Sequence, residues 1–224
     1  MRLGDDAGAA QTQNRGLELA LLLTLPAAIA LAVAAHPILA AVYQHGAFGA
    51  AQTAATAPAL AAYAVGLPAF VLVKVMAPGF FARHDTATPV KIAAVTVAVN
   101  IVLTVTLGLV LPLAHVGVAL ATSIAGWVNA LSLVAMLQRS GHFALDGQAR
   151  RSLPRIALAA LGMGVLLFAA EQLLAPALAG RLALQLAAVA ALIGSGLVVY
   201  AGLALLLGVV DWREVRRRLR RQAA

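Results

Sequence analysis

Long runs without charged residues dominate this chain of 224 residues. No Asp, Glu, Lys or Arg occurs between Glu18 and Lys74, and none occurs between Lys91 and Arg139. A helix needs about 20 apolar residues to cross a bilayer, so each run is long enough for two crossings. Helices satisfy their own backbone hydrogen bonds in hydrocarbon. The pattern therefore predicts an integral membrane protein built from helices.

The apolar segments predict six transmembrane helices, with polar or turn-forming residues between them. The fold class expected is an all-α, polytopic membrane helix bundle. Each segment has about the spanning length or somewhat more, which a tilted helix accommodates. The expected spans are residues 18–42, 54–81, 92–113, 116–137, 156–176 and 182–209.

The basic residues predict the orientation of these spans. Of the 16 Lys and Arg residues, all except Arg181 fall on one side of the membrane. Basic residues collect on the cytoplasmic side, so both termini are expected there. The chain then divides into a cytoplasmic segment (1–17), a four-helix part (18–138), a basic cytoplasmic loop (139–155), two further helices (156–209) and a basic amphipathic cytoplasmic tail (210–224).

Composition supports a membrane location and narrows the chemistry. The chain is 62% hydrophobic and 11% charged, against about 45–50% and 25% in soluble domains. It has no cysteine, which excludes disulfides and thiolate metal sites. The net charge of +8 does not predict nucleic-acid binding, because six arginines lie in the tail Trp212–Arg221. That amphipathic tail is expected to lie on the anionic inner leaflet, or alternatively to bind a regulator or partner.

Sequence motifs for catalysis are missing from the chain. It contains no HExxH, GxSxG or Walker sequence and no paired-carboxylate motif, so we expect neither an enzyme nor a cofactor. The five histidines are scattered over loops and helix ends, which favours polar interface residues over a metal site. Function is therefore expected to reside in what the membrane helices hold or move.

The segment Leu72–Ile92 contains the strongest candidates for a functional role. Lys74 lies about two turns before the end of the second span, at a depth where a charge costs a few kcal/mol unless it finds a partner or the interface. Two interpretations stay open: the side chain extends to the interface, or it faces a polar cavity and meets an anionic group. Pro78 and Gly79 predict a kink or hinge in the same helix.

The short connection after this helix is crowded with polar residues. Arg83, Asp85, Thr88 and Lys91 lie within nine positions of one another. Such turns usually cap the two helices they join. Alternatively, Asp85 forms an ion pair with Arg83 or Lys91.

Polar residues inside the other spans favour packing roles. Asn100 and Asn129 are expected to hydrogen-bond neighbouring helices, with a ligand role as the alternative. Glu171 could pair with Arg181 across an outer loop or take part in an ion relay. Small residues recur every four positions before Asn129, which predicts close helix contact at Gly117, Ala121 and Ala125.

Two further prolines suggest broken helices. Pro26 and Pro68 are expected to interrupt the first and second spans. Interrupted helices are common in transporters, in which one bundle moves against another. They also occur in static membrane helices, so this feature alone does not assign a function.

Three stretches of this chain resemble the MurJ/MviN family. They are residues 25–48, 62–93 and 117–137, and the most specific matches are HGAF (45–48) and KVMAPGFFARHDTATPVK (74–91). The family comprises the lipid II flippases of bacterial peptidoglycan synthesis, within the multidrug/oligosaccharidyl-lipid/polysaccharide flippase superfamily. The resemblance extends over nearly the whole chain and is looser after Ser140.

The resemblance implies that only part of such a flippase is present. Family members have fourteen helices, and this chain is similar to the last six: part of the C-terminal lobe and two extra helices that form a groove for the lipid tail. The N-terminal lobe, which holds most of the family's transport-linked cations, would be a missing partner. The transport-linked or substrate-binding candidates here are Lys74, Arg83, Asp85, Lys91 and Asn100, with Pro78 and Gly79 as the hinge.

The implied function is that of a C-terminal flippase fragment in the bacterial inner membrane. It would move lipid II, or a related undecaprenyl-linked glycolipid, from the inner to the outer leaflet by alternating access. Its other partners would be membrane lipids. Two alternatives stay open: another polysaccharide-lipid or drug transporter of the superfamily, and a truncated remnant without transport. The polar start at Met1 suggests a truncated gene, a split subunit or a mis-called start.

Overall fold

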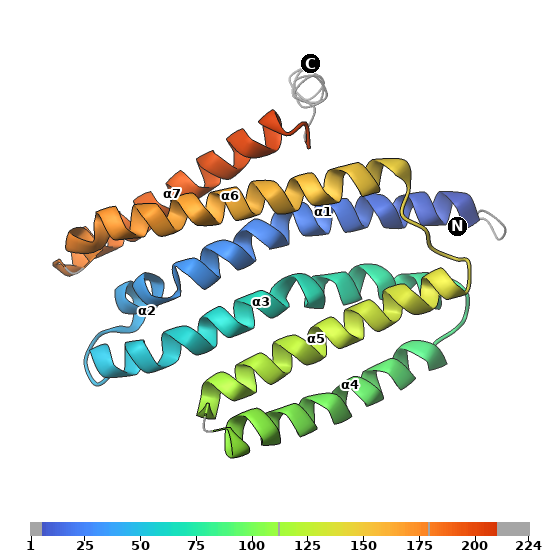
Figure 1. The fold of residues 1–224 in the computed structure, drawn as a ribbon, viewed down its shortest axis with the longest axis horizontal. Coiled ribbons are helices and arrows are strands. Elements are labelled where there is room, and N and C mark those ends of the chain that lie inside the picture. The colour runs from blue at the N-terminus through green and yellow to red at the C-terminus, as the bar shows by residue number, and fades with distance from the viewer. Residues whose placement is uncertain (1–5, 112, 179, 210–224) are drawn as a thin grey trace.

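A computed structural model describes residues 6–111, 113–178 and 180–209 of the chain. All regular structure within these residues is helical (Figure 1). The tail segment Trp212–Arg221 lies outside the described residues. The elements are α1 (Asp6–Val33), α2 (Ala35–Tyr43), α3 (Ala50–Phe81), α4 (Ala87–Val105), the π-helical segment η1 (Thr106–Val110), α5 (Ala114–Arg139), α6 (Gly147–Leu178) and α7 (Leu182–Leu206).

The prediction of six membrane spans is confirmed. Six helical segments of the described residues are long and apolar enough to cross a bilayer. The second ends at Phe81, as expected, but most extend beyond their predicted bounds. Helix α6 already begins at Gly147, so Arg150, Arg151 and Arg155 lie on helix within the stretch expected to be a loop.

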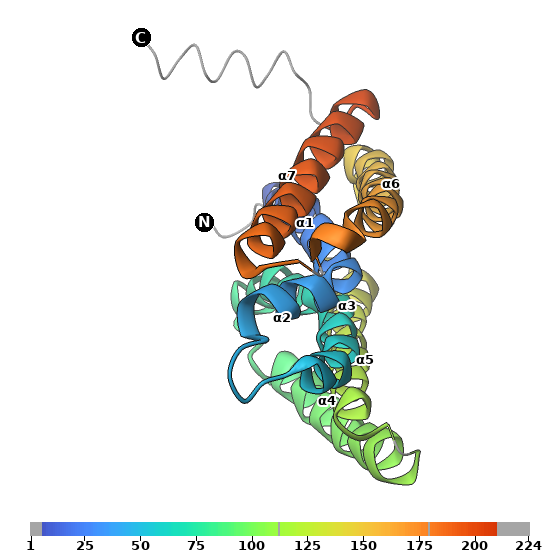
Figure 2. The same ribbon diagram turned by 90° about the vertical axis from the view of Figure 1, so that its left-hand side faces the viewer.

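The helices lie side by side in a single row. Neighbouring contacts run in the order α7, α6, α1, α3, α5 and α4 (Figure 1). A view turned by 90° shows the same elongated stack, with α7 and α4 far apart (Figure 2). Two apolar cores hold the row together: one joins α1, α3 and α5, and the other joins α1, α6 and α7. Helix α1 therefore links the two parts of the molecule.

The two sides of the molecule at which the helices begin and end differ in charge. One end, here named the basic end, contains the start of α1 and the α3–α4 and α5–α6 connections. The end of α7 also lies there, because Arg155 Nη1 donates to the Gly208 carbonyl at 3.4 Å. The other end, here named the opposite end, contains the α2–α3, α4–α5 and α6–α7 connections.

The first span is broken at Ala34, not at Pro26. α1 ends at Val33 and α2 begins at Ala35, while Pro26 lies inside α1. Pro37 explains the break: it has no N–H to donate to the carbonyl of Val33, and its ring crowds that carbonyl. The expected interruption at Pro26 was therefore wrong, because the span is broken at Ala34 instead.

Pro26 is tolerated because another helix compensates for it. A proline at this position leaves the carbonyl of Leu22 without its helical donor. The hydroxyl of Tyr200 on α7 donates to that carbonyl at 2.7 Å. Neighbouring side chains can satisfy the backbone groups that prolines free in membrane helices. Tyr200 thus ties α7 to α1 where α1 lacks an internal bond.

Pro68 likewise does not interrupt α3, and the expected break there was wrong. This helix contains prolines 58, 68 and 78 at ten-residue intervals. Each proline leaves the carbonyl four positions before it without a helical donor. The next carbonyl along the chain, three positions before the proline, is contacted by a polar side chain of a neighbouring helix. The contacts join His115 Nε2 to Ala55 O at 2.6 Å, Trp127 Nε1 to Val65 O at 3.0 Å and Gln13 Nε2 to Val75 O at 3.4 Å.

Small residues bring α3 and α5 close together. A Cβ on Gly66 would lie 2.6 Å from Ser123 Oγ and 3.0 Å from its Cα. The same hydroxyl donates to the carbonyl of Ala62 at 2.7 Å. Gly117, Ala121 and Ala125 are all buried, as the four-residue repeat predicted, and Gly117 packs against η1. Asn129, at the end of the same repeat, is half-buried.

Helix α4 lies at the edge of the row and buries none of its side chains. It contacts mainly α5, and Ile101 and most of its valines are exposed. An apolar helix of this kind needs lipid or other protein segments around it.

Candidate functional site

A pocket opens between α1 and α3 at the basic end, and we call it the α1–α3 pocket. Its volume is about 420 Å³. It combines two cationic side chains with an otherwise mainly small or apolar wall. The lining residues are Thr12, Gln13, Gly16, Lys74, Val75, Pro78, Gly79, Ala82 and Arg83.

The α1 wall of this pocket depends on Gly79. Gln13 Nε2 lies 3.4 Å from both the Val75 and Met76 carbonyls of α3. A Cβ on Gly79 would come within 2.8 Å of the same nitrogen. Glycine therefore permits the close approach of the Gln13 amide at this turn.

Lys74 and Arg83 give the pocket its positive charge. Lys74 is exposed and lies seven residues before the end of α3, about 10 Å along the helix. Arg83 lies just beyond the helix and turns back, so that Nη1 donates to the Gly79 carbonyl at 2.7 Å. Cations near a helix C-terminus are stabilised by the helix dipole. Arg83 therefore also caps α3, whereas Lys74 offers its ammonium to the pocket.

Asp85 and Lys91 lie outside the pocket, in the connection to α4 and its first turns. Asp85 Oδ1 accepts the backbone N–H of Thr88 at 3.0 Å. Hydrogen bonds from Thr88, with a smaller contribution from the charge of Lys91, hold the pKa of this exposed carboxyl below its ordinary value. The carboxylate stays ionised at neutral pH and caps α4, which is the first of the two roles considered for this turn.

Asn100 is also separate from the pocket. It lies half-buried in α4, and its Oδ1 accepts the hydroxyl proton of Thr104 at 3.1 Å. This partner is one turn further along the same helix. The expected hydrogen bond to a neighbouring helix was therefore wrong for Asn100.

Glu171 does not form the suggested ion pair with Arg181. Among the described residues, the ion pairs join Arg15 to Glu18 and to Asp146, both at the basic end. Glu171 instead lines a separate cavity at the opposite end.

Sequence reasoning missed the polar network that positions α1 beside α6. Arg15 Nη2 lies 2.5 Å from Asp146 Oδ2, and Ser152 Oγ donates to Glu18 Oε1 at 2.5 Å. Asp146 also accepts the Ala149 N–H at 2.7 Å and so caps α6. The local signal was an acidic residue before a helix, but the pairing with Arg15 spans 131 positions.

Gln13 and Asn14 were missed for the same reason. Asn14 is buried, and its Nδ2 donates to the carbonyl of Ala144 at 2.9 Å. Residues 6–17 were expected to be a polar segment ahead of the membrane. Their helix instead forms one wall of the α1–α3 pocket, against residues more than 60 positions away.

Comparison with known proteins provides an independent assignment. The family model described as "Lipid II flippase MurJ" matches residues 2–188. The chain is 40% identical over 227 residues to the probable lipid II flippase MurJ of Rhizobium meliloti (strain 1021), covering 100% of this chain and 42% of that protein. It is 39% identical over 226 residues to that of Rhizobium tropici, covering 99% and 42%. A lipid II flippase MurJ of Burkholderia cenocepacia is 37% identical over 129 residues, covering 57% and 24%. The chain thus spans less than half the length of these relatives.

Proposed function

Because this chain belongs to the lipid II flippase MurJ family, we propose that it forms the C-terminal part of a lipid II flippase. In this proposal it moves the lipid-linked peptidoglycan precursor from the inner to the outer leaflet, together with an N-terminal lobe. Two observations support a function shared with a further lobe: the chain has six membrane spans, and it covers 42% of the length of the two Rhizobium relatives.

The basic end would face the cytoplasm of a bacterial inner membrane. Arg15, Lys74, Arg83, Lys91 and the arginines of residues 139–155 all belong to this end, whereas Arg181 belongs to the other. Basic residues are retained on the cytoplasmic side during insertion. The α1–α3 pocket would then open toward the leaflet from which lipid II is collected.

The α1–α3 pocket is the observation that supports this function best. A pyrophosphate is dianionic or more negative, and Lys74 and Arg83 are two cations at the rim of one cavity. The apolar wall formed by Val75, Pro78 and Ala82 offers no polar groups that compete for the headgroup, and it lowers the local polarity around the two cations. Lys74 would neutralise the headgroup, and Arg83 would contribute charge while it caps α3.

The last turn of α3 would act as the moving part. Pro78 removes one helical hydrogen bond, and the Gln13 contacts to this turn are long, at 3.4 Å. A small rotation of the turn about Pro78 and Gly79 would change the width of the pocket. In alternating access, such a rotation would accompany the movement of one lobe against the other.

Complementation tests this function. A bacterium depleted of its own flippase would receive the chain alone, the upstream part of the Rhizobium meliloti relative alone, or both. We expect growth and lipid II export only with both parts. If the pair fails while the full-length relative succeeds, the proposed function is wrong; rescue by the chain alone would contradict the need for the N-terminal lobe.

A further inference from the structure

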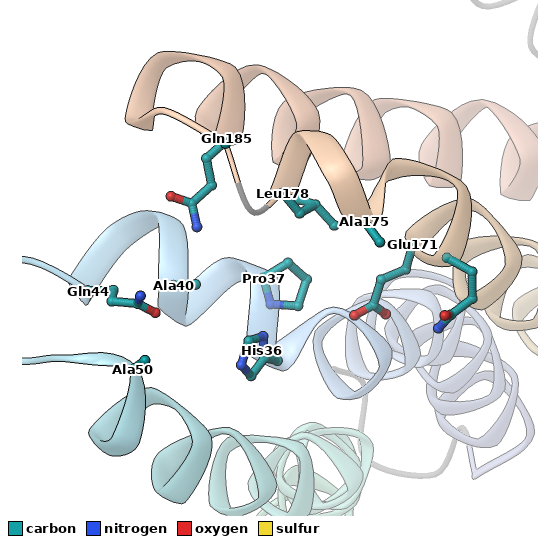
Figure 3. Close-up of a pocket in the computed structure, with 11 residues that line it drawn as sticks. His36, Pro37, Ala40, Gln44, Ala50, Glu171, Ala175, Leu178 and Gln185 are labelled. Atoms are coloured by element: carbon teal, nitrogen blue, oxygen red, sulfur yellow. The ribbon is translucent and has the colours of Figure 1, made fainter.

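A second cavity lies at the opposite end, between α2, α6 and α7 (Figure 3). We call it the α2–α6–α7 pocket, and its volume is about 490 Å³. The break at Ala34 creates it, because α2 turns away from the line of α1 and leaves space beside the end of α6.

Polar side chains from all three helices face this cavity. Figure 3 shows Glu171 of α6 and Gln185 of α7 directed toward α2, with His36 and Gln44 on the other side. Gln172 also lines the pocket. The lining thus presents three amides, an imidazole and one carboxylate to the cavity.

The depth of Glu171 places the cavity near the membrane interface. α6 has 32 residues and is about 48 Å long, which exceeds the hydrocarbon thickness of about 30 Å. Glu171 lies seven residues before the end of α6, about 10 Å along its axis. The carboxylate is thus close to the boundary between hydrocarbon and headgroups.

The charge balance of the cavity favours a cationic ligand group. Glu171 is the one carboxylate in its lining, and the ion pairs among the described residues lie at the basic end. A carboxylate removed from bulk water is stabilised by a cation. An anionic ligand would meet repulsion here.

We propose that the α2–α6–α7 pocket binds the ammonium-bearing headgroup of a zwitterionic phospholipid, of the ethanolamine type. Glu171 accepts the ammonium. The phosphate lies toward the first turn of α2, whose residues His36 and Pro37 line the cavity. The acyl chains follow exposed apolar side chains of α6 and α7, among them Leu173, Leu182 and Leu186.

Lipid binding to the unaltered chain tests the proposal without any substitution. The purified chain in detergent is titrated with lipid at pH 8. The probes are phosphatidylethanolamine, its N-acetylated form and phosphatidylglycerol, all with the same acyl chains, and binding is measured by native mass spectrometry. We expect phosphatidylethanolamine to bind about tenfold more tightly than the other two, because they lack the ammonium. Equal binding of the three lipids would overturn the proposal.

Two variants then locate the site. Glu171→Gln is expected to lose the preference for phosphatidylethanolamine, because the variant lacks the carboxylate that accepts the ammonium and repels the two anionic lipids. Glu214→Gln, which removes the same charge 43 positions away, is expected to keep the preference. An unchanged preference in the Glu171 variant would show that the ammonium binds elsewhere and would contradict the assignment.

A soluble competitor separates a lipid site from a site for free amines. O-Phosphoethanolamine has the same headgroup without acyl chains. We expect it not to displace the lipid at millimolar concentration, because the apolar faces of α6 and α7 contribute to binding. Full displacement at that concentration would refute a phospholipid as the ligand. None of these measurements depends on the orientation of the chain or on its role in transport.

Discussion

At the residue scale, the positive charges of Lys74 and Lys91 lie in different surroundings. Both lysines are exposed, but only Lys74 lines a cavity with an apolar wall. Lys91 lies near the start of α4, close to the Asp85 carboxylate. An ammonium beside an apolar wall interacts with an anion more strongly than one surrounded by water. Of these two lysines, Lys74 is therefore the one expected to act on a substrate headgroup.

We predict that Lys74→Met abolishes transport in the two-part flippase, whereas Lys91→Met leaves it near normal. Met keeps the length and apolar character of the stem but removes the charge. Lys74→Arg distinguishes a requirement for charge from one for a compact ammonium, because a guanidinium differs in shape. The measurement is lipid II export at equal membrane abundance. Normal export by Lys74→Met would leave only the interpretation that Lys74 extends to the interface.

At the element scale, neighbouring helices are held together by side-chain hydroxyls of one helix that donate to backbone carbonyls of the other. Tyr200 donates to the carbonyl that Pro26 leaves free, and Ser123 donates to α3 beside Gly66. Each contact combines a close approach with a hydrogen bond, which is how helices associate when lipid offers no hydrophobic driving force. Such contacts predict specific changes in stability.

Tyr200→Phe is expected to destabilise the chain by about 0.6–1.7 kcal/mol, since it removes one interhelical hydrogen bond in the membrane. In a Pro26→Ala background the same change is expected to cost less, because the introduced alanine donates its own N–H to the carbonyl of Leu22. Unfolding in detergent of the four members of this double-mutant cycle measures the coupling. Equal costs in both backgrounds would show that Tyr200 does not compensate for Pro26.

Gly66→Ala is expected to destabilise the α3–α5 interface by about 1–3 kcal/mol, the usual cost of overpacking. The added Cβ would lie 3.0 Å from the backbone of Ser123, so the two helices must separate. Gly202→Ala in α7 is the matched control, because nothing lies within 4 Å of its added Cβ. Thermal unfolding of both variants in detergent makes the comparison. A Gly66 variant as stable as the control would mean that the interface is looser than described.

At the scale of the whole molecule, a single row of helices leaves two broad faces without protein cover. α4 buries no side chain, and exposed apolar residues also line α6 and α7. A row of this kind suits part of a larger assembly better than an isolated bundle, because a closed bundle buries one face of every helix. The share of the relatives' length that the chain covers agrees with this reasoning.

The orientation of the row is tested by cysteine labelling, since the native chain has no cysteine. Ala47, Ala87 and Ala144 are all exposed in connections or at helix starts. Single cysteines at Ala87 and Ala144 are expected to resist an impermeant reagent added from outside, and one at Ala47 is expected to react. The reversed pattern would invert the topology. Labelling of Ala47 and Ala87 from the same side would contradict the number of spans.

Much of the candidate site could be predicted from one local segment. Lys74, Pro78, Gly79 and Arg83 lie on neighbouring turns, so a short stretch of sequence places them together. Gln13 could not be found in this way, because its contact with α3 spans 62 positions. The break in the first span could in principle be predicted from Pro37. Pro26 does not break the helix, because the Tyr200 hydroxyl of a distant helix donates to the carbonyl that this proline leaves free.

The sequence by itself determined the helical class, the six spans and the asymmetry of charge. These follow from the local cost of placing charged groups or unpaired backbone in hydrocarbon, which each segment reveals on its own. Only the tertiary structure decided which helices are neighbours, which prolines are tolerated and where the two cavities lie. Those features depend on hydrogen bonds and close approaches between residues up to 178 positions apart, and a single sequence contains no local signal of such pairs.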